Sequence, residues 1–305
     1  MEACCGSSSQ AVEWGMEFLR TDDVMSPPPV RLFVPERRGA PLVFASPHSG
    51  RAYPPSFVAA SRLDPLRLRR SEDAFVDLLF ASMPLYGAPL VTATFPRAFC
   101  DANREPWELD PGMFEDELPD WVNADSPRVA AGLGTLARVV ASGEGIYRGR
   151  LRFAEAQARI AEFWHPFHAA LREEIAATRE IFGACLLIDC HSMPGNSMAP
   201  RQAADVVLGD VHGSTCDGAM MRRLEVLLRG QGFSVRRNDP YAGGYITRNY
   251  GRPREHVHAV QIEILRSLYM DEDRVEMLPE FAEIQARLAA AMAGLAAEAG
   301  VLLGV

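Results

Sequence analysis

Two histidines of this chain, His48 and His191, stand directly after short apolar runs that are typical of buried strands. Neutral imidazole is a preferred ligand of Zn²⁺, which in catalytic sites has a third protein ligand and an open position for water. Glu72 and Asp73 offer carboxylates at the start of a predicted helix, where acidic residues also complement the helix dipole. The sequence therefore predicts one Zn²⁺, or another divalent metal, held by both histidines and one of these carboxylates. The alternative is two hydrogen-bonded loop histidines.

Glu263 interrupts an otherwise apolar predicted strand over residues 258–265. A buried carboxylate is costly unless it is paired or functional. Beside a water activated by a metal, it can accept a proton as general base and return it to a leaving amine as general acid. The alternative is a glutamate on the outward face of an alternating strand.

Candidate substrate-binding residues follow the predicted strand over 89–95, in the segment FPRAFCDANREPW. Its members Arg97, Asn103 and Arg104 suit a carboxylate, because the guanidinium fork donates two parallel hydrogen bonds and an asparagine amide can donate beside it. A surface salt-bridge network is the alternative. Ser192, next to His191, is a further substrate-binding candidate.

A second candidate segment, NDPYAGGYITRNYG, spans residues 238–251. It contains Tyr245 and Arg248, and its paired glycines permit the backbone to approach a ligand closely. It lacks the pattern of a phosphate-binding loop. We predict a flexible loop that covers the substrate, with a tyrosine-rich turn as the alternative.

The other histidines have weaker claims. His165 and His168 lie three residues apart on a predicted helix, but their aromatic neighbours favour packing over metal binding. His212 lies in a turn-like segment, and no chemistry is assigned to His256 and His258.

The elements that must position these residues alternate between strands and helices, which indicates an α/β sandwich with a partly parallel sheet. In such sheets, sites gather at the carboxyl ends of the strands. The predicted strands cover 41–46, 89–95, 184–192, 205–210, 233–239 and 258–265. The predicted helices cover 71–86, 152–181, 217–231 and 279–299.

Composition bounds the function. The chain has 305 residues, a formal net charge of −9 and 48% apolar residues, which argues against nucleic-acid binding because that needs clustered Lys and Arg. We find no signal peptide and no apolar run of membrane-spanning length. Six cysteines without a CxxC pair predict free buried thiols, and hence a cytoplasmic enzyme. We expect a flexible tail over 1–27 and a single hydrolase domain over 28–305, with an irregular insertion at about 105–150.

Eight motifs, in order from about residue 40 to 290, resemble the N-formylglutamate amidohydrolase family. They are SPHSGRAYP, SEDAFVDLLF, RAFCDANREP, GLGTLARVVASGEGIY, IDCHSMPG, DVVLGDVHG, NDPYAGGYITRNYG and VQIEILRSLYMDE. The resemblance implies a three-layer α/β/α sandwich around a mixed, largely parallel sheet, as in phosphorylase/hydrolase-like and zinc-exopeptidase-like folds.

The resemblance also implies a mononuclear zinc held by His48, Asp73 and His191, with Glu72 as the alternative acid. The HxxE pattern of carboxypeptidases is absent, because Arg51 occupies its last position. Glu263 matches the catalytic glutamate of those relatives. Asn103 and Arg104 match their carboxylate-binding pair, Arg248 is a further carboxylate ligand, and Arg97 is expected to stabilise the oxyanion.

The expected function is zinc-dependent hydrolysis of the amide of N-formylglutamate or a related N-acyl amino acid, a small anionic substrate. Two alternatives remain open at this point. One is a zinc carboxypeptidase or amidase that acts on peptides or cell-wall fragments. The other is a non-catalytic small-molecule binder on the same fold. The oligomeric state is left open.

Overall fold

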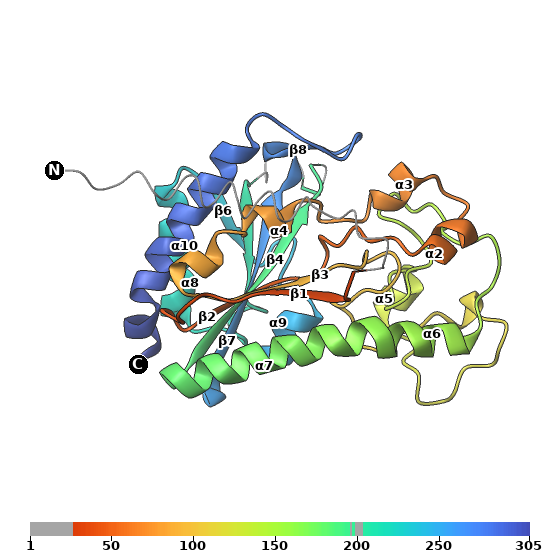
Figure 1. Cartoon of the computed structure of the whole chain (residues 1–305), viewed down its shortest axis with the longest axis horizontal. Helices are drawn as coiled ribbons and strands as arrows, with labels where there is room; N and C mark the ends of the chain where they lie inside the picture. Colours follow the sequence, from red (N-terminus) through yellow and green to blue (C-terminus); the bar gives the residue numbers. More distant parts are fainter. Residues whose placement is uncertain (1–26, 196, 199–203) are drawn as a thin grey trace.

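A mixed seven-stranded sheet forms the centre of the molecule in the computed structural model, which describes residues 27–195, 197–198 and 204–305 (Figure 1). The strand order is β1-β3-β2-β4-β7-β5-β6. The strands are β1 (Val30–Phe33), β2 (Leu42–Ser46), β3 (Leu90–Ala93), β4 (Cys185–Met193), β5 (Val206–Gly209), β6 (Val235–Arg237) and β7 (Val257–Leu265).

The four central strands β3, β2, β4 and β7 are parallel to one another. β1 pairs antiparallel with β3 at one edge, and β5 pairs antiparallel with β7 near the other edge, where β6 runs parallel to β5. The expected mixed, largely parallel sheet is confirmed. The edge strand β1 has no counterpart among the predicted strands.

Helices cover both faces of the sheet, as the three-layer expectation requires. The helices α4 (Val76–Leu79), α8 (Gly218–Gly230) and α10 (Phe281–Leu303) pack on one face, and α7 (His165–Phe182) and α9 (Tyr245–Tyr250) pack on the other. Figure 1 shows α8 and α10 side by side, with α7 across the sheet from them.

Strand periodicity divides the core into two clusters. In β4, Leu186 and Ile188 face the α8/α10 side, whereas Leu187 faces the α7 side. Successive side chains of a strand point to opposite faces, so Asp189 and His191 continue the row that Leu187 belongs to. In β7, Gln261 and Glu263 continue the row of Ala259 in the same way. Polar groups thus replace apolar ones on the α7 face, towards the carboxyl ends of both strands.

The C-terminal helix α10 is long and apolar enough, by length and composition alone, to cross a membrane. The prediction that the chain has no apolar run of this length is therefore wrong. Its buried residues recur every three or four positions and pack in the core cluster of the α8/α10 face: Ile284, Leu288, Ala291, Met292, Leu295 and Ala299. This spacing describes a helix with one face on a protein core.

The helix expected over 71–86 is wrong in extent. Phe75 has a left-handed backbone with φ of 65°, so the helical turn α4 starts only after it, and Pro84 falls in a separate 3₁₀ turn (Met83–Tyr86). Proline disfavours a continuous helix because it lacks an N–H. The helix expected over 152–181 is confirmed as α6 (Phe153–Arg159), a π-helical stretch (Ile160–Trp164) and α7.

The remaining elements are short and lie mostly outside the sandwich. Residues 105–150 contain a 3₁₀ turn (Pro111–Met113), α5 (Pro127–Ala130) and isolated β-bridges. The others are α2 (Pro55–Ala60), α3 (Pro65–Arg69), β8 (Met270–Asp271), β9 (Glu276–Met277) and two 3₁₀ turns (Pro253–Glu255 and Arg266–Leu268). The predicted tail over 1–27 lies outside the described residues, except for Pro27.

Candidate metal centre and active site

His48, Asp73 and His191 converge at the carboxyl ends of β2 and β4, with one potential ligand atom from each lying within 4.8 Å of the others. Asp73 Oδ2 is 3.3 Å from His48 Nδ1 and 2.9 Å from His191 Nδ1. All three residues are buried. Two imidazoles and a carboxylate are a donor set that suits Zn²⁺.

The far side of each imidazole is bound to a buried carboxylate. His48 Nε2 is 2.6 Å from Asp101 Oδ1, and His191 Nε2 is 2.9 Å from Asp189 Oδ1. A carboxylate behind a histidine favours the tautomer with the proton on that side. Both Nδ1 lone pairs then point at Asp73, so three acceptors face one another with no donor between them. A cation at this point satisfies all three, and the residues therefore fit a metal ion.

The pKa shifts in this cluster also indicate that positive charge is favoured between these residues. Burial opposes the charge on Asp73, but the close approach of the His191 and His48 imidazoles holds the pKa of its carboxyl well below the usual value. Burial also opposes a charge on His191, yet Asp189 and Asp73 raise the pKa of its imidazole well above 6.5. A proton on His191 thus takes the place that a cation would fill.

Asp73, and not Glu72, is the carboxylate that lies against the two histidines. The Glu72 carboxylate accepts a hydrogen bond from Tyr53 Oη at 2.8 Å and bonds from the Arg69 guanidinium at 3.0 to 3.2 Å. The backbone N–H of Asp73 donates to the His48 carbonyl at 3.0 Å, which fixes the turn. Adjacent side chains of this turn leave in different directions, so only Asp73 meets the histidines.

Arg266 orients the second oxygen of Asp73. Its Nη2 donates to Asp73 Oδ1 at 2.9 Å, while its Nε donates to Ser192 Oγ at 3.1 Å. Ser192, expected to bind substrate, lines the cavity but has its hydroxyl on this arginine. The guanidinium is buried and leaves Oδ2 of Asp73 for the histidines.

Glu263 lies beside this cluster because His191 and Glu263 are directly paired residues of β4 and β7. Gln261 Nε2 donates to Glu263 Oε1 at 2.7 Å. Burial raises the pKa of the Glu263 carboxyl to about 7, with His191 opposing the rise and Asp73 adding to it. A carboxyl with a pKa near neutrality is well suited to exchange protons. The alternative of an outward-facing glutamate is excluded by its burial.

A cavity of about 480 Å³ opens over these groups. It is lined by the metal cluster, Glu263 and a set of arginines: Arg97, Arg104, Arg128, Arg248 and Arg266. Arg97 Nη2 donates to Asp101 Oδ2 at 2.9 Å. Arg248 uses its Nε only for the Gly243 carbonyl, at 3.3 Å. The concentration of guanidinium groups fits an anionic ligand.

Asn103 and Arg104 are largely engaged by the protein itself. Asn103 Oδ1 accepts from the N–H of Ile246 at 2.7 Å, and its Nδ2 lies 3.0 Å from His191 Nε2. Arg104 donates through Nε to the Leu133 carbonyl at 2.9 Å and through Nη1 to the Asn103 carbonyl at 2.8 Å. Asn103 therefore couples α9 to the metal cluster, and the Nη2 end of Arg104 lies nearest to Asp101.

Tyr245, expected to bind substrate, does not line this cavity. Its ring packs against Trp164 and His168, at 6.0 and 5.7 Å between ring centroids. The tyrosine that lines the cavity is Tyr241, in the same loop. His168 is a packing residue, as expected: Tyr250 Oη and the Ala102 carbonyl each lie 2.8 Å from its ring nitrogens.

Four polar residues that contact His48, Asp73, His191 or Glu263 were assigned no role from the sequence: Asp101, Asp189, Gln261 and Arg266. A signal for two of them is the spacing of two residues along a strand, which places Asp189 on the face of His191 and Gln261 on the face of Glu263. Asp101 and Arg266 lie outside the strands, and no periodicity points to them.

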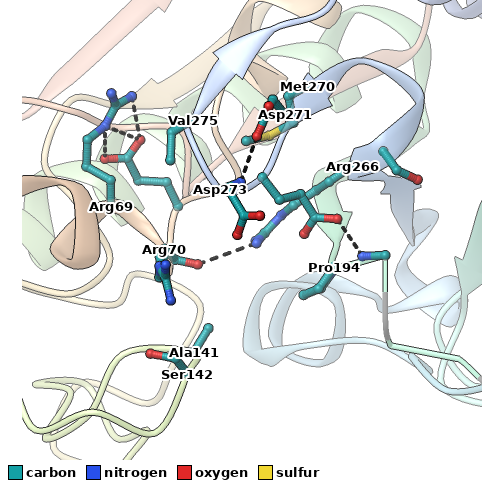
Figure 2. A pocket seen from close by; sticks show the side chains of 14 residues that line it. Arg69, Arg70, Ala141, Ser142, Pro194, Arg266, Met270, Asp271, Asp273 and Val275 are labelled. Carbon is teal, nitrogen blue, oxygen red and sulfur yellow. Dashed lines mark hydrogen bonds and ion pairs between the residues drawn. The ribbon is translucent and has the colours of Figure 1, made fainter.

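A second cavity of about 480 Å³ adjoins the first and shares Ala141, Pro194 and Arg266 with it. Figure 2 shows Arg266 Nη1 reaching the Arg70 carbonyl, at 3.4 Å, on this side. Both acidic and basic side chains line the second cavity. One of the acidic residues, Glu272, accepts a hydrogen bond from the Gly195 N–H at 2.8 Å. The Arg266 side chain thus lies between the two cavities and lines both of them.

The fold and this site together define an α/β enzyme that carries the groups with which metal-dependent hydrolases activate water. The chain belongs to the N-formylglutamate amidohydrolase family, whose model matches residues 40–270. It is 32% identical over 242 residues to the N-formylglutamate deformylase of Pseudomonas aeruginosa, covering 78% of this chain and 85% of that protein. It is 30% identical over 237 residues to the Pseudomonas putida deformylase, covering 76% and 82%.

A crystal structure of N-formylglutamate amidohydrolase from Ralstonia eutropha JMP134 matches with a TM-score of 0.84. The match covers 90% of this chain and 100% of the crystal chain, at 38% identity. The family membership inferred from the eight motifs is confirmed, and the chain is a hydrolase that acts on an amide bond.

Proposed function

We propose that this protein is a zinc-dependent amidohydrolase that converts N-formylglutamate to formate and glutamate. The observation that carries the proposal is the convergence of His48 Nδ1, Asp73 Oδ2 and His191 Nδ1 beside Glu263, within a cavity rich in arginine. The names of the relatives support the formyl substrate, and the donor set supports zinc.

The metal would be held by His48, Asp73 and His191. When bound, zinc polarises the substrate carbonyl and lowers the pKa of a water towards about 7. Glu263 takes a proton from the water that attacks the formyl carbon. It then delivers this proton to the amide nitrogen as the C–N bond breaks, which releases formate and the free amino group.

The arginines divide the remaining tasks. Arg97 lines the cavity beside Asp101 and stabilises the negative charge that develops on the carbonyl oxygen. Arg104 and Arg248 bind substrate carboxylates, with Asn103 as a residue that positions α9 against His191. An acidic protein needs such local positive charge because its net field repels an anionic substrate.

A cytoplasmic location and a single domain over 28–305 are part of the proposal. The cytoplasmic location is supported by Cys100, Cys185, Cys190 and Cys216, which are free and buried. We further propose that neither a nucleic acid nor a membrane is a partner.

The release of free amino groups from a panel of compounds tests the function, with formate measured in addition for the formyl compounds. The purified protein, with one equivalent of Zn²⁺, is assayed with N-formylglutamate, other N-acyl amino acids, and short peptides. We expect N-formylglutamate to give the highest kcat/KM. Faster cleavage of peptides supports the carboxypeptidase alternative, and ligand binding without turnover of any compound supports the binder.

A further inference from the structure

Arg128 is an exposed arginine that lines the active-site cavity without contacting the metal cluster. Across residues 27–195, 197–198 and 204–305, it has no carboxylate within ion-pair distance. By contrast, Arg97 is bound to Asp101 and Arg266 to Asp73. A guanidinium that faces a cavity without an acidic partner is available for an anion in that cavity.

Arg128 lies in the short helix α5, whose backbone is held by a capping residue. Ser126 caps the helix by accepting a hydrogen bond from the Val129 N–H at 3.0 Å, and its own hydroxyl donates to Glu108. Val129 is buried, whereas Arg128, one position earlier, is exposed. Figure 1 shows α5 on the same side of the molecule as α2, α3 and α6, beyond the end of the sheet.

The chain that follows α5 is tied to the candidate site. The Leu133 carbonyl accepts from Arg104 Nε at 2.9 Å, and the Thr135 carbonyl accepts from the Asp101 N–H at 2.7 Å. The Thr135 N–H in turn donates to the Glu108 carbonyl at 2.8 Å. These bonds hold the backbone that follows α5, and with it the backbone of Arg128, in place relative to Arg104 and the metal cluster.

The charged groups form a sequence that leads outwards from the metal cluster. Asp101 contacts His48 at 2.6 Å, and Arg104 Nη2 lies 3.8 Å from Asp101. Arg104 is buried, and its pKa is lowered first by that burial. The Arg128 carbonyl accepts from the Leu133 N–H at 2.8 Å, and the Leu133 carbonyl accepts from Arg104 Nε at 2.9 Å, so a single residue links Arg128 to Arg104.

This order matches the order of groups in an acidic N-acyl amino acid. Its α-carboxylate is attached directly to the carbon that bears the scissile amide, whereas the side-chain carboxylate of a glutamate lies three carbon–carbon bonds from that carbon. We propose that Arg128 binds this side-chain carboxylate and sets the preference of the enzyme for acidic over neutral substrates. The α-carboxylate is left to Arg104 and Arg248, the two arginines assigned above to carboxylate binding. This inference rests on the proposed function.

The test compares two substrates of equal shape, N-formyl-L-glutamate and N-formyl-L-glutamine, in the zinc-loaded full chain. Wild-type enzyme is expected to prefer the glutamate substrate. Arg128→Gln is expected to raise KM for the glutamate substrate about tenfold to hundredfold, because a hydrogen bond to a charged group is lost. KM for the glutamine substrate and kcat for both are expected to change less than about threefold. Arg128→Lys is expected to restore part of the preference.

Arg150→Gln is the matched control, since Arg150 is exposed in the same irregular segment but does not line the cavity. Melting temperatures of all variants check that the fold is intact. If Arg128→Gln keeps the wild-type ratio of kcat/KM between the two substrates, the role of Arg128 is refuted while the proposed function stands. If wild-type enzyme hydrolyses neither substrate, the proposed function and this inference both fail.

Discussion

His191 and Glu263 occupy directly paired positions of the parallel strands β4 and β7, so a metal-ligand candidate and a proton-transfer candidate stand side by side on one face of the sheet. Each continues a row of side chains that is apolar closer to the amino end of its strand. Pairing in the sheet fixes this neighbourhood more rigidly than two loops can, and rigid placement is what proton transfer to a reacting group requires.

The variant Glu263→Gln is expected to lower kcat by about 100-fold or more and to change KM only a few-fold. Glutamine keeps the shape of the side chain and can still accept from Gln261 Nε2, but it cannot take a proton from water. Steady-state kinetics of formate release measures this. Retention of more than half of the wild-type kcat would show that another group moves the proton.

The choice of Asp73 over Glu72 predicts opposite effects of two neighbouring substitutions on metal content. Asp73→Asn should lower bound zinc well below one ion per chain, because a charged ligand is lost between the two histidines. Glu72→Gln is the matched control and should keep a full complement. Elemental analysis of dialysed protein gives both values. Equal zinc content in the two variants contradicts the assignment.

The buried imidazole of His168 is expected to make the folded protein less stable in mild acid. Burial lowers the pKa of this imidazole from 6.5 to about 3, whereas the unfolded chain takes up the proton near 6.5. Between these values acid therefore favours the unfolded state, by about 1.4 kcal/mol per pH unit from this residue. His168→Gln cannot titrate, so its stability should fall less between pH 7 and pH 5, by roughly 2 kcal/mol. Urea unfolding at the two pH values tests this, and parallel losses would refute it.

Substitution of Gly244 by alanine is expected to inactivate the enzyme through a steric clash. A Cβ at this position would lie 2.3 Å from Asn103 Nδ2, so Gly244→Ala must displace the Asn103 side chain from its place beside His191. We expect a fall in kcat/KM of about tenfold or more. Gly145→Ala is the control, since a Cβ there meets nothing within 4 Å. An active Gly244→Ala enzyme would show that the Asn103 contact is dispensable.

The sequence by itself determined most of the strand and helix order of the sandwich, without the edge strand β1, and most of the central site. Hydrophobic periodicity is a local property, and it marked β4 and β7 because their apolar rows are interrupted by His191 and Glu263. The parallel order of the central strands then brings their carboxyl ends to one edge. His48 follows β2 at that same edge, so the two histidines meet as their positions predict.

Only the tertiary structure decided which carboxylate joins them and which residues surround the cavity. The direction of Asp73 depends on a backbone bond to the His48 carbonyl, 25 residues away in the chain, and its second oxygen depends on Arg266. Tyr245 turns to the aromatic core, while Arg128 reaches the cavity from an irregular segment. Such directions are set by contacts between distant segments, and no local pattern of residue types encodes them.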